Sequence, residues 1–179
     1  DKTINMTVAG DVLCHNTNFW DAYDSKTDSY DFSYTFEDIK KYFDNADIAI
    51  GTLESNFAGK SVGYSNYPLF NAPEDLATDL KELGFDILAT ANNHCLDKGF
   101  SGMVSTLAEL DELDMAGIEH MGTYATEETS KEYIVEDVNG IKMAFLNYTY
   151  GTNGIAIPNG KKYAVNLIDK EKIKSDLEN

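Results

Sequence analysis

Short runs of apolar residues alternate along the chain with longer segments whose apolar residues recur every three or four positions. The short runs predict strands. They span residues 3–9, 46–53 and 87–89. The longer segments have the period of amphipathic helices. They span residues 35–45, 73–83 and 100–116. Because strands that alternate with helices form a largely parallel sheet with helices on its face, the pattern predicts an α/β fold.

The remaining segments predict one antiparallel element and several loops. Asn139-Gly140 is a favoured two-residue hairpin turn between two β-branched and aromatic runs, so residues 133–148 predict a β-hairpin. We expect a short strand at 165–168 and a last helix capped by Asp169. Four segments without a period predict loops, the first with one helical turn. They are residues 19–34, 64–71, 117–122 and 149–162.

The densest group of reactive side chains is the sequence ANNHCLD at residues 91–97, directly after the strand predicted at 87–89. It places an amide, an imidazole, a thiol and a carboxylate within five residues. Polar groups that leave the carboxyl end of a buried strand lie where open α/β sheets bind ligands. The plainer interpretation is that Asn92 and Asn93 shape a turn and that His94 caps a helix.

Two carboxylates, Asp11 and Glu54, follow the other two predicted strands in the same way. A lone Gly-Asp is a common turn sequence, but three strand ends in one parallel sheet bring these carboxylates close to Asn93 and His94. Carboxylate, amide and imidazole groups suit Mn²⁺, Mg²⁺, Fe or Zn²⁺. A two-metal centre built from them would generate hydroxide for attack on phosphorus.

The other histidines and the two cysteines are scattered. A single histidine near an aspartate is more often a surface residue than a ligand, so His15 ranks below Asp11 as a candidate. We expect His120 to be structural or exposed. Cys14 and Cys95 are too few for a disulfide framework. Each follows one of the strands that end in candidate ligands, so we expect them to face each other at one end of the sheet and to form a disulfide in an oxidising compartment. Two unrelated, half-buried thiols are the alternative.

Composition narrows the class of protein. The 179 residues suffice for one domain with a sizeable core. Fourteen Lys and Arg against 31 Asp and Glu give a net charge of −17, which disfavours nucleic acid and anionic membrane surfaces as partners. No run reaches the ~20 apolar residues of a membrane span, and no signal peptide is visible. Because the sequence starts at Asp1, we expect a leader or anchor to have been removed.

Seven blocks of the sequence together resemble one family. They are Gly10-Asp11, Leu53-Glu54, Phe70-Asn71-Ala72-Pro73, Gly84-Phe85-Asp86, Ala91-Asn92-Asn93-His94 with Asp97, the helix at 100–116 and the strand at 140–145. They resemble the CapA family, the poly-γ-glutamate capsule synthesis proteins, from about residue 3 to the end. The family is similar in fold to the calcineurin-like metallophosphoesterases, whose domain is a sandwich of two sheets flanked by helices. The resemblance implies that residues 1–179 belong to a single such domain, truncated at its C-terminus, and hold only its N-terminal half with the first of the two sheets.

The resemblance also implies roles for single residues. Asp11 stands where the phosphoesterases have their first aspartate, Glu54 at their bridging aspartate and Asn93 at their metal-binding asparagine. His94 stands at the histidine that donates a proton to the leaving group, which makes it the catalytic residue. Leu13 replaces the histidine that accompanies the first aspartate, so one metal ligand is missing.

Four further residues, Asn56, Asn71, Asn92 and Asp97, are expected to support the site or bind substrate. The histidine motifs that complete such sites lie further downstream in the family. We therefore expect the intact protein to use a divalent metal (Mn, Mg, Fe or Zn) and this chain to bind one weakly or not at all.

Two functions follow from these residues. The protein is either a metal-dependent hydrolase acting on a phosphoester or a polymer bond, or a non-catalytic module that binds, exports or anchors an anionic polymer. The replacement of a metal-ligand histidine by Leu13 favours the non-catalytic module. The retention of Glu54 and His94 favours the hydrolase. A third interpretation is an α/β domain whose motifs arise by chance. The resemblance implies an extracytoplasmic protein, membrane-anchored or secreted, that works on a capsule polymer with membrane-bound capsule synthesis components.

Overall fold

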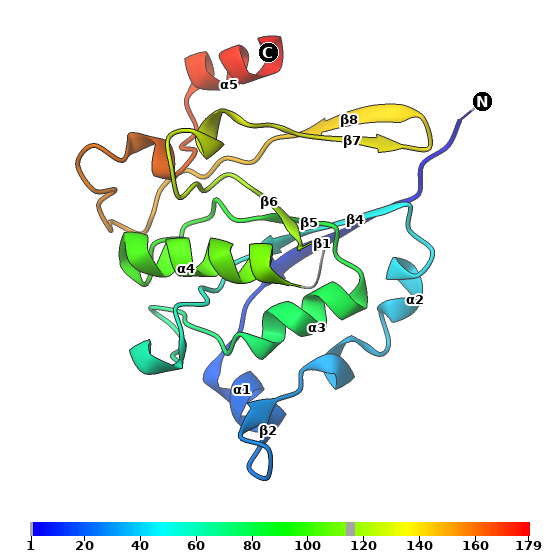
Figure 1. The fold of residues 1–179 in the computed structure, drawn as a ribbon, viewed down its shortest axis with the longest axis vertical. Coiled ribbons are helices and arrows are strands. Elements are labelled where there is room, and N and C mark those ends of the chain that lie inside the picture. Colours follow the sequence, from blue (N-terminus) through cyan, green and yellow to red (C-terminus); the bar gives the residue numbers. More distant parts are fainter. Residues whose placement is uncertain (1, 114–116) are drawn as a thin grey trace.

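A four-stranded parallel sheet forms the centre of the computed structural model, which describes residues 2–113 and 117–179. Its strands lie side by side in the order β1-β4-β5-β6 (Figure 1). Their bounds are β1 (Met6–Val12), β4 (Ile48–Leu53), β5 (Ile87–Ala89) and β6 (Glu119–Met121). All three neighbouring pairs are parallel, so the carboxyl ends of the strands share one edge. The predicted α/β fold is confirmed.

Helices cover one face of the sheet. Leu88 points to this face and packs in one hydrophobic cluster with Leu76 and Leu80 of α3 (Asp75–Leu83). Leu110 of the longer helix α4 (Gly99–Glu112) belongs to the same cluster. Gly84 ends α3 with a φ of +115°, a conformation that favours glycine. Burial of each large apolar side chain contributes roughly 1.5–3 kcal/mol, so this layer is a main source of stability.

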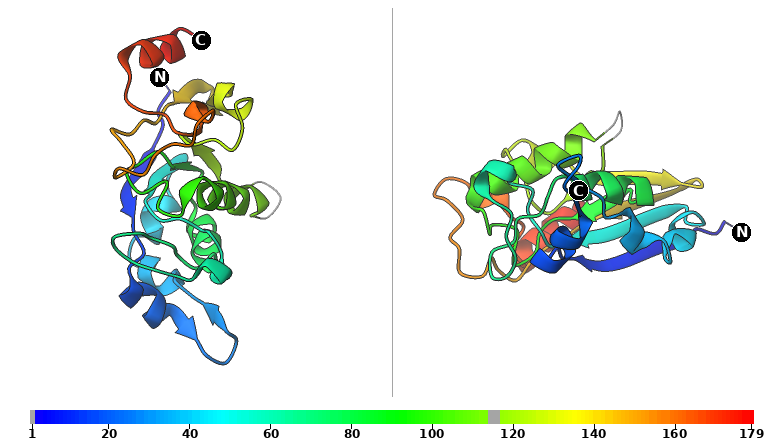
Figure 2. Two further views of the ribbon diagram at one scale, coloured as in Figure 1. Left: turned by 90° about the vertical axis from the view of Figure 1, so that its left-hand side faces the viewer. Right: turned by 90° about the horizontal axis from the view of Figure 1, so that it is seen from below.

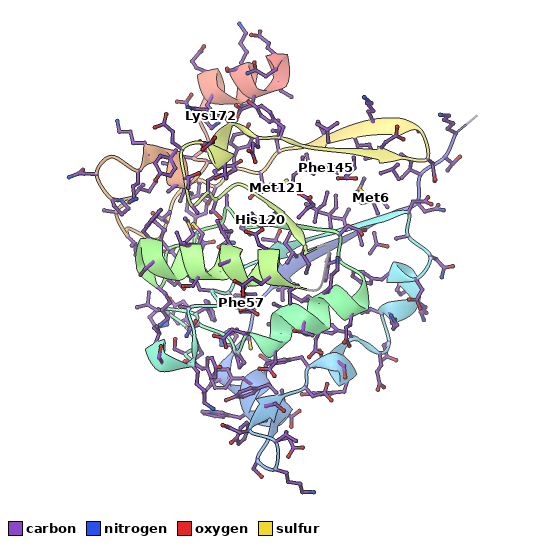
Figure 3. All side chains as sticks on the ribbon, in the orientation of Figure 1. Met6, Phe57, His120, Met121, Phe145 and Lys172 are labelled. Atoms are coloured by element: carbon purple, nitrogen blue, oxygen red, sulfur yellow. The ribbon has the colours of Figure 1, made fainter. Side chains whose placement is uncertain are left out.

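A β-hairpin covers the opposite face. It consists of β7 (Ile134–Val138) and β8 (Ile141–Phe145), joined by Asn139 and Gly140 with φ of 54° and 75°, as the Asn-Gly turn predicts. Figure 3 shows Met121 and Phe145 in the layer between β6 and the hairpin, where they belong to one cluster with Ile87. The result is a layered structure of helices, parallel sheet and hairpin.

Smaller elements fill the connections between these layers. They are α1 (Asn16–Ala22), β2 (Tyr23–Asp24), β3 (Ser29–Tyr30), α2 (Lys40–Phe43), α5 (Lys170–Glu178) and 3₁₀ turns at Ser33–Phe36, Lys60–Val62, Thr129–Lys131 and Lys162–Ala164. Helix α5 lies at the end of the molecule away from α1 and β2 (Figure 2). No helix in residues 2–113 and 117–179 is long and apolar enough to cross a membrane.

Several sequence predictions need correction. The predicted loop at 19–34 contains most of α1 and a small hairpin, because packing among Tyr30, Phe32 and Tyr64 orders it. The helix predicted at 35–45 is reduced to the end of a 3₁₀ turn and the single turn α2. The helix predicted at 100–116 ends at Glu112, and its residues 114–116 lie outside the described residues.

Strand boundaries also shift. The first strand continues past Ala9 to Val12, so Asp11 lies inside β1 and not after it, and the pairing register shifts between Val8 and Asp11. The predicted connection at 117–122 contains the edge strand β6, which is too short and too polar to show a period. The strand predicted at 165–168 forms only isolated bridges, at Val165 and Leu167.

Helix α5 is held by polar contacts, since none of its residues is fully buried. The side chain of Asp169 caps it by accepting from the Lys172 amide at 2.8 Å, as predicted. The Asp176 carboxylate accepts hydrogen bonds from the hydroxyls of Tyr133 (3.0 Å) and Tyr148 (2.6 Å) and from Lys172 Nζ (2.8 Å). Burial acts to raise the pKa of Asp176, but these hydrogen bonds outweigh it and lower the pKa.

We expect the substitution Asp176→Asn to lower the Tm at pH 7 by about 2–4 °C, the effect of ~1 kcal/mol in a chain of this size. Because the folded-state pKa lies below the unfolded value of about 3.9, this stabilisation is present above that pH and is lost as the pH falls through the folded-state pKa. Calorimetry at pH 7 and at pH 2.5 measures the difference in Tm between the variant and the wild type at each pH. Glu178→Gln, at an exposed residue of the same helix, is the control and should change little. A loss as large at pH 2.5 as at pH 7 would contradict the ionic explanation.

Candidate functional site

Asp11, Glu54 and His94 meet at the carboxyl edge of the sheet. Asp11 pairs with Thr52 near the end of β4, and Glu54 follows that strand directly. Thr52 in turn pairs with Ala89, the last residue of β5. His94 Nε2 lies 3.9 Å from Glu54 Oε1, which brings the end of β5 to the end of β4. The three strand ends therefore do converge, as the pattern of the sequence predicts.

Asn92 holds the segment that carries His94 in place. Its side-chain amide donates to the Leu53 carbonyl oxygen at 2.7 Å, which ties the end of β5 to the end of β4. Its oxygen accepts from the His94 amide at 2.9 Å. Both ends of the side chain are thus occupied by backbone, so Asn92 shapes the turn and supports the site.

Asp97 orients the imidazole of His94. Oδ2 of Asp97 lies 2.8 Å from His94 Nδ1 and also accepts from the Phe70 amide at 2.7 Å. A carboxylate accepts hydrogen bonds, so Nδ1 carries the proton and Nε2 faces Glu54. The Asp97 side chain is fully buried, and this burial raises its pKa against the lowering effect of the two hydrogen bonds.

Glu54 and Asp11 form a pair of interacting carboxylates. The pKa of Glu54 is raised, first by burial and then by the charge of Asp11 and a hydrogen bond with it, while His94 acts in the opposite direction. Two such oxygens side by side are stabilised by a shared proton or by a shared cation. The two carboxylates therefore offer the kind of oxygen donors that a hard divalent cation prefers.

The residues present do not complete a metal centre. Within residues 2–113 and 117–179 there is no group of three His, Cys, Asp or Glu placed to hold a metal ion. Asp11, Glu54 and Asn93 supply oxygens only, whereas two-metal phosphoesterase sites also use nitrogen ligands. Position 13, where the family resemblance implies a histidine, holds Leu13. The donor set fits part of one coordination shell.

Phe70 links His94 to the other side of the site. Its ring lies edge-on to His94 at 4.8 Å between centroids and edge-on to His15 at 5.1 Å. His15 is half-buried at the start of α1, and its amide donates to Asn18 Oδ1. His15 therefore packs against Phe70 and is only partly exposed, whereas the sequence favoured a surface residue.

Asn56 and Asn71 are buried and bonded to backbone. Asn56 Nδ2 donates to the His94 carbonyl oxygen at 2.9 Å. Asn71 has no exposed surface, accepts from the Ala58 amide at 2.7 Å and donates to the Gly63 carbonyl oxygen at 3.0 Å. Both side chains support the loops of the site. Whether either also contacts substrate stays a prediction.

The predicted disulfide between Cys14 and Cys95 is wrong. Both thiols are free and buried. Cys14 packs in the cluster that contains Phe19, whereas Cys95 packs in a separate cluster with Met103. Burial raises the pKa of Cys14 to about 12 and that of Cys95 to about 11, so both remain protonated and unreactive at neutral pH. Cys14 follows β1 and Cys95 follows β5, and β4 lies between these two strands in the sheet.

Asn153 is a residue of the site that the sequence did not single out. It lies in the loop 149–162, and its Nδ2 is 3.4 Å from both ring nitrogens of His94. Its Oδ1 is 3.4 Å from Asn93 Nδ2. The only local signal was Asn153-Gly154, a pair that favours left-handed backbone.

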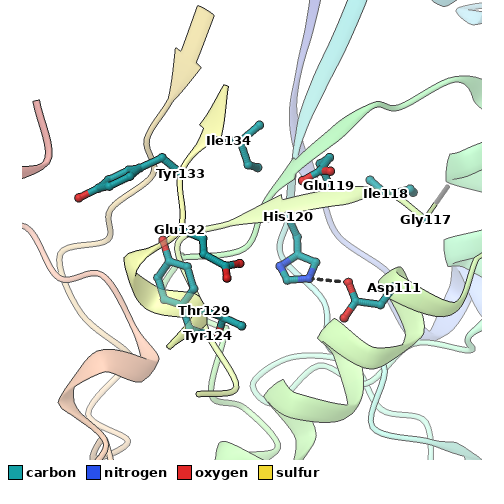
Figure 4. A pocket seen from close by; sticks show the side chains of 10 residues that line it. All are labelled: Asp111, Gly117, Ile118, Glu119, His120, Tyr124, Thr129, Glu132, Tyr133 and Ile134. Carbon is teal, nitrogen blue, oxygen red and sulfur yellow. Dashed lines mark hydrogen bonds and ion pairs between the residues drawn. The ribbon is translucent and has the colours of Figure 1, made fainter. Parts of the chain in front are cut away.

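His120 lies in a different place, at a cavity of about 410 Å³ beside the edge strand β6 (Figure 4). Its Nε2 is 3.0 Å from Asp111 Oδ1, and Glu119 and Glu132 also line the cavity. No residue of the candidate site lines this cavity. His120 therefore belongs to the outer surface of the sheet, in agreement with the structural or exposed role expected from the sequence.

The sequence matches the family model described as "Bacterial capsule synthesis protein PGA_cap" over residues 5–179. The chain belongs to this family. Capsule biosynthesis protein CapA of Bacillus anthracis is 26% identical over 161 residues, 83% of this chain and 35% of that protein. PGA biosynthesis protein CapA of Bacillus subtilis (strain 168) is 30% identical over 122 residues, 64% of this chain and 30% of that protein. The chain thus spans about a third of the length of these relatives.

Membership in the PGA_cap family confirms the resemblance carried by the seven sequence blocks. The parallel sheet with flanking helices is consistent with part of a metallophosphoesterase-like domain. The family and its relatives point to a role in the cell envelope. The metal-binding and catalytic roles of Asp11, Glu54, Asn93 and His94 stay predictions.

Proposed function

We propose that the chain is part of a capsule-synthesis protein in which His94 acts as an acid–base group on an anionic envelope polymer. The bond is either a phosphoester or a bond of the polymer itself. The observation that supports this most is the imidazole of His94, held by Asp97 with its free nitrogen toward Glu54. The names of the two relatives, which refer to capsule and PGA biosynthesis, support the choice of polymer.

His94 Nε2 is the ring nitrogen that can exchange a proton with a ligand, because Nδ1 is bound to Asp97. In hydrolysis, water forms a new bond to phosphorus or to a carbonyl carbon while the bond to the leaving atom breaks, which is oxygen in a phosphoester and nitrogen in an amide of the polymer. The protonated Nε2 gives its proton to that leaving atom, and the attacking water releases one proton to the solvent, from which Nε2 is protonated again. Asp97 stabilises the imidazolium form before the transfer and fixes the ring orientation, as the aspartate does in other His–Asp pairs.

Cations are expected to control access of the substrate. The chain carries a net charge of −17, and the carboxylates of Asp11 and Glu54 border the site, so an anionic polymer is repelled in the absence of counterions. Mn²⁺, Mg²⁺, Fe or Zn²⁺ could be held in part by these oxygens and Asn93. The ligands present do not complete a shell, so the proton transfer rests on His94.

The same proposal places the protein outside the cytoplasm, membrane-anchored or secreted, where a capsule polymer and membrane-bound synthesis components would be met. A second candidate is a non-catalytic module that binds or anchors the polymer. The incomplete metal ligand set, with Leu13 at a position where the family resemblance implies histidine, favours this alternative.

We expect weak binding of Mn²⁺ and Zn²⁺ by this chain, and slow turnover of bis-p-nitrophenyl phosphate or shortening of poly-γ-glutamate that increases with added Mn²⁺. Calorimetry measures the binding, and absorbance or gel electrophoresis measures the turnover. The metal-binding measurement is repeated with Asn93→Ala, which removes one of the expected metal ligands. Tight binding that Asn93→Ala abolishes would show a complete metal site. Polymer binding without any turnover would favour the non-catalytic module.

A further inference from the structure

Five asparagines of the candidate site and its supporting loops fall into two classes. The buried ones, Asn56, Asn71 and Asn92, each make at least one side-chain hydrogen bond of 2.7–2.9 Å to backbone groups. Asn93 and Asn153 are only half-buried or exposed, and the side-chain contacts of both lie at 3.4 Å. At that length an amide hydrogen bond is near its limit. The first class therefore shapes the site, and the second keeps donors available for a ligand.

The side chain of Asn153 is exposed, but a turn fixes the backbone that carries it. It adopts a φ of 50° and is followed by Gly154 with a φ of 78°, so the two form a left-handed turn. The turn is closed by the Thr152 hydroxyl, which donates to the Ile155 carbonyl oxygen at 2.6 Å. Ile155 packs against the hydrophobic cluster that contains Ala91 and Cys95. The loop is thus anchored to the segment that carries His94.

The free nitrogen of His94 lies between two groups without a short hydrogen bond to either. Glu54 Oε1 is 3.9 Å from Nε2, too far for a hydrogen bond, and Asn153 Nδ2 is 3.4 Å away. A ligand oxygen bound to Nε2 would therefore lie within reach of Asn153 Nδ2. Because a side-chain amide nitrogen only donates, it would complement a lone pair on that oxygen.

The negative charge of the groups beside His94 makes the amide donor of Asn153 important. The ionisable groups paired with His94 are the carboxylates of Glu54 and Asp97, which repel an anionic ligand. The side-chain amides of Asn93 and Asn153 are neutral donors beside these carboxylates. Such donors, aimed at an oxygen that gains charge, stabilise it strongly when they are fixed in advance.

We propose that Asn153, together with Asn93, donates hydrogen bonds to an anionic oxygen of the substrate group that lies beside His94 Nε2, an inference that rests on the proposed function. The ligand class is an oxyanion, either the phosphoryl group of an ester or a carboxylate of the polymer. Asn153 is then a substrate-binding residue carried by a loop that lies more than 50 residues beyond His94 in the sequence.

The test compares Asn153→Gly, which keeps the left-handed backbone and removes the amide, with Asn153→Asp, which replaces the donor with a negative charge. Asn159 lies in the same loop and is also followed by glycine, so Asn159→Gly and Asn159→Asp are matched controls. We expect Asn153→Gly to lower kcat/KM by about tenfold or more, the effect of one hydrogen bond to a charged group, and Asn153→Asp to lower it further. The substrates are bis-p-nitrophenyl phosphate and poly-γ-glutamate, which distinguish the two sources of oxyanion.

A second readout does not need turnover. In NMR titrations with inorganic phosphate and with glutarate, the side-chain amide of Asn153 should shift and saturate, and that of Asn159 should not. If the wild-type protein has no turnover but Asn153 still shifts, the proposed catalysis fails and the oxyanion site stands. If turnover is present and both Asn153 variants match their Asn159 controls, the oxyanion site is wrong and the proposed catalysis stands. If the Asn153 variants do not lower kcat/KM and the Asn153 amide does not shift, the assignment of Asn153 as an oxyanion-binding residue is overturned.

Discussion

Replacing His94 with alanine is expected to lower turnover of the phosphodiester or polymer substrate by about 10²–10⁴-fold, the range that a general acid contributes. Asp97→Asn should lower it by about 10²-fold or more through the ring orientation. The asparagine side chain has one oxygen for the two donors that Asp97 now accepts, the Phe70 amide and His94 Nδ1. If its oxygen stays on Phe70, its NH₂ group faces Nδ1 and forces the proton to Nε2.

Steady-state kinetics with circular dichroism spectra of each variant measure this result. His120→Ala is the matched control, because His120 also pairs with an aspartate but lies at the separate cavity beside β6. It should retain turnover within about threefold, as expected for a surface substitution. A folded His94→Ala variant with turnover near that of the wild type would eliminate the acid–base role.

The second large effect concerns stability. We expect Gly122→Ala to lower the free energy of unfolding by about 3–5 kcal/mol, from the combined costs of a left-handed alanine, overpacking and a lost buried hydrogen bond. Gly122 has a φ of +100°, and a Cβ there would lie 2.6 Å from the Cβ of Ala91 and would overlap Asn147 Oδ1. That oxygen accepts from the Ala91 amide at 2.7 Å, directly before the residues of the site.

Gly160→Ala separates the backbone cost of a left-handed alanine from the cost of the side-chain contacts. Gly160 has a φ of +79°, but a Cβ at this residue would meet no other atom within 4 Å, so only the backbone cost of roughly 1 kcal/mol applies. Urea unfolding monitored by fluorescence measures both variants. Similar losses in the two proteins would show that the contacts with Ala91 and Asn147 do not matter.

Local signals in the sequence were sufficient for the elements that organise the site. Apolar runs predicted β4 and β5, and Asn139-Gly140 predicted the hairpin turn, because each depends on neighbours in the chain. The parallel arrangement followed from the alternation of strands and helices. This predicted parallel arrangement was enough to place Asp11, Glu54 and His94 at one edge of the sheet.

Contacts between distant segments decided what the sequence could not show. The edge strand β6 exists because Glu119–Met121 pairs with β5, and its own three residues carry no period. The 64–71 segment lacks regular structure, yet Phe70 shares Asp97 with His94. These pairings cost chain entropy and are stabilised only by long-range packing, so no local pattern reports them.

By itself, the sequence determined the order of strands and helices and the residue types at the carboxyl ends of the strands. The family resemblance, carried by whole blocks, added which of these residues correspond to a phosphoesterase site. Only the tertiary structure decided which side chains turn inward. It separated Cys14 from Cys95, buried Asn56 and Asn71, and brought Asn153 to His94. The physical reason is that periodicity fixes the face of an element, whereas the partner on that face depends on how the layers and loops pack together.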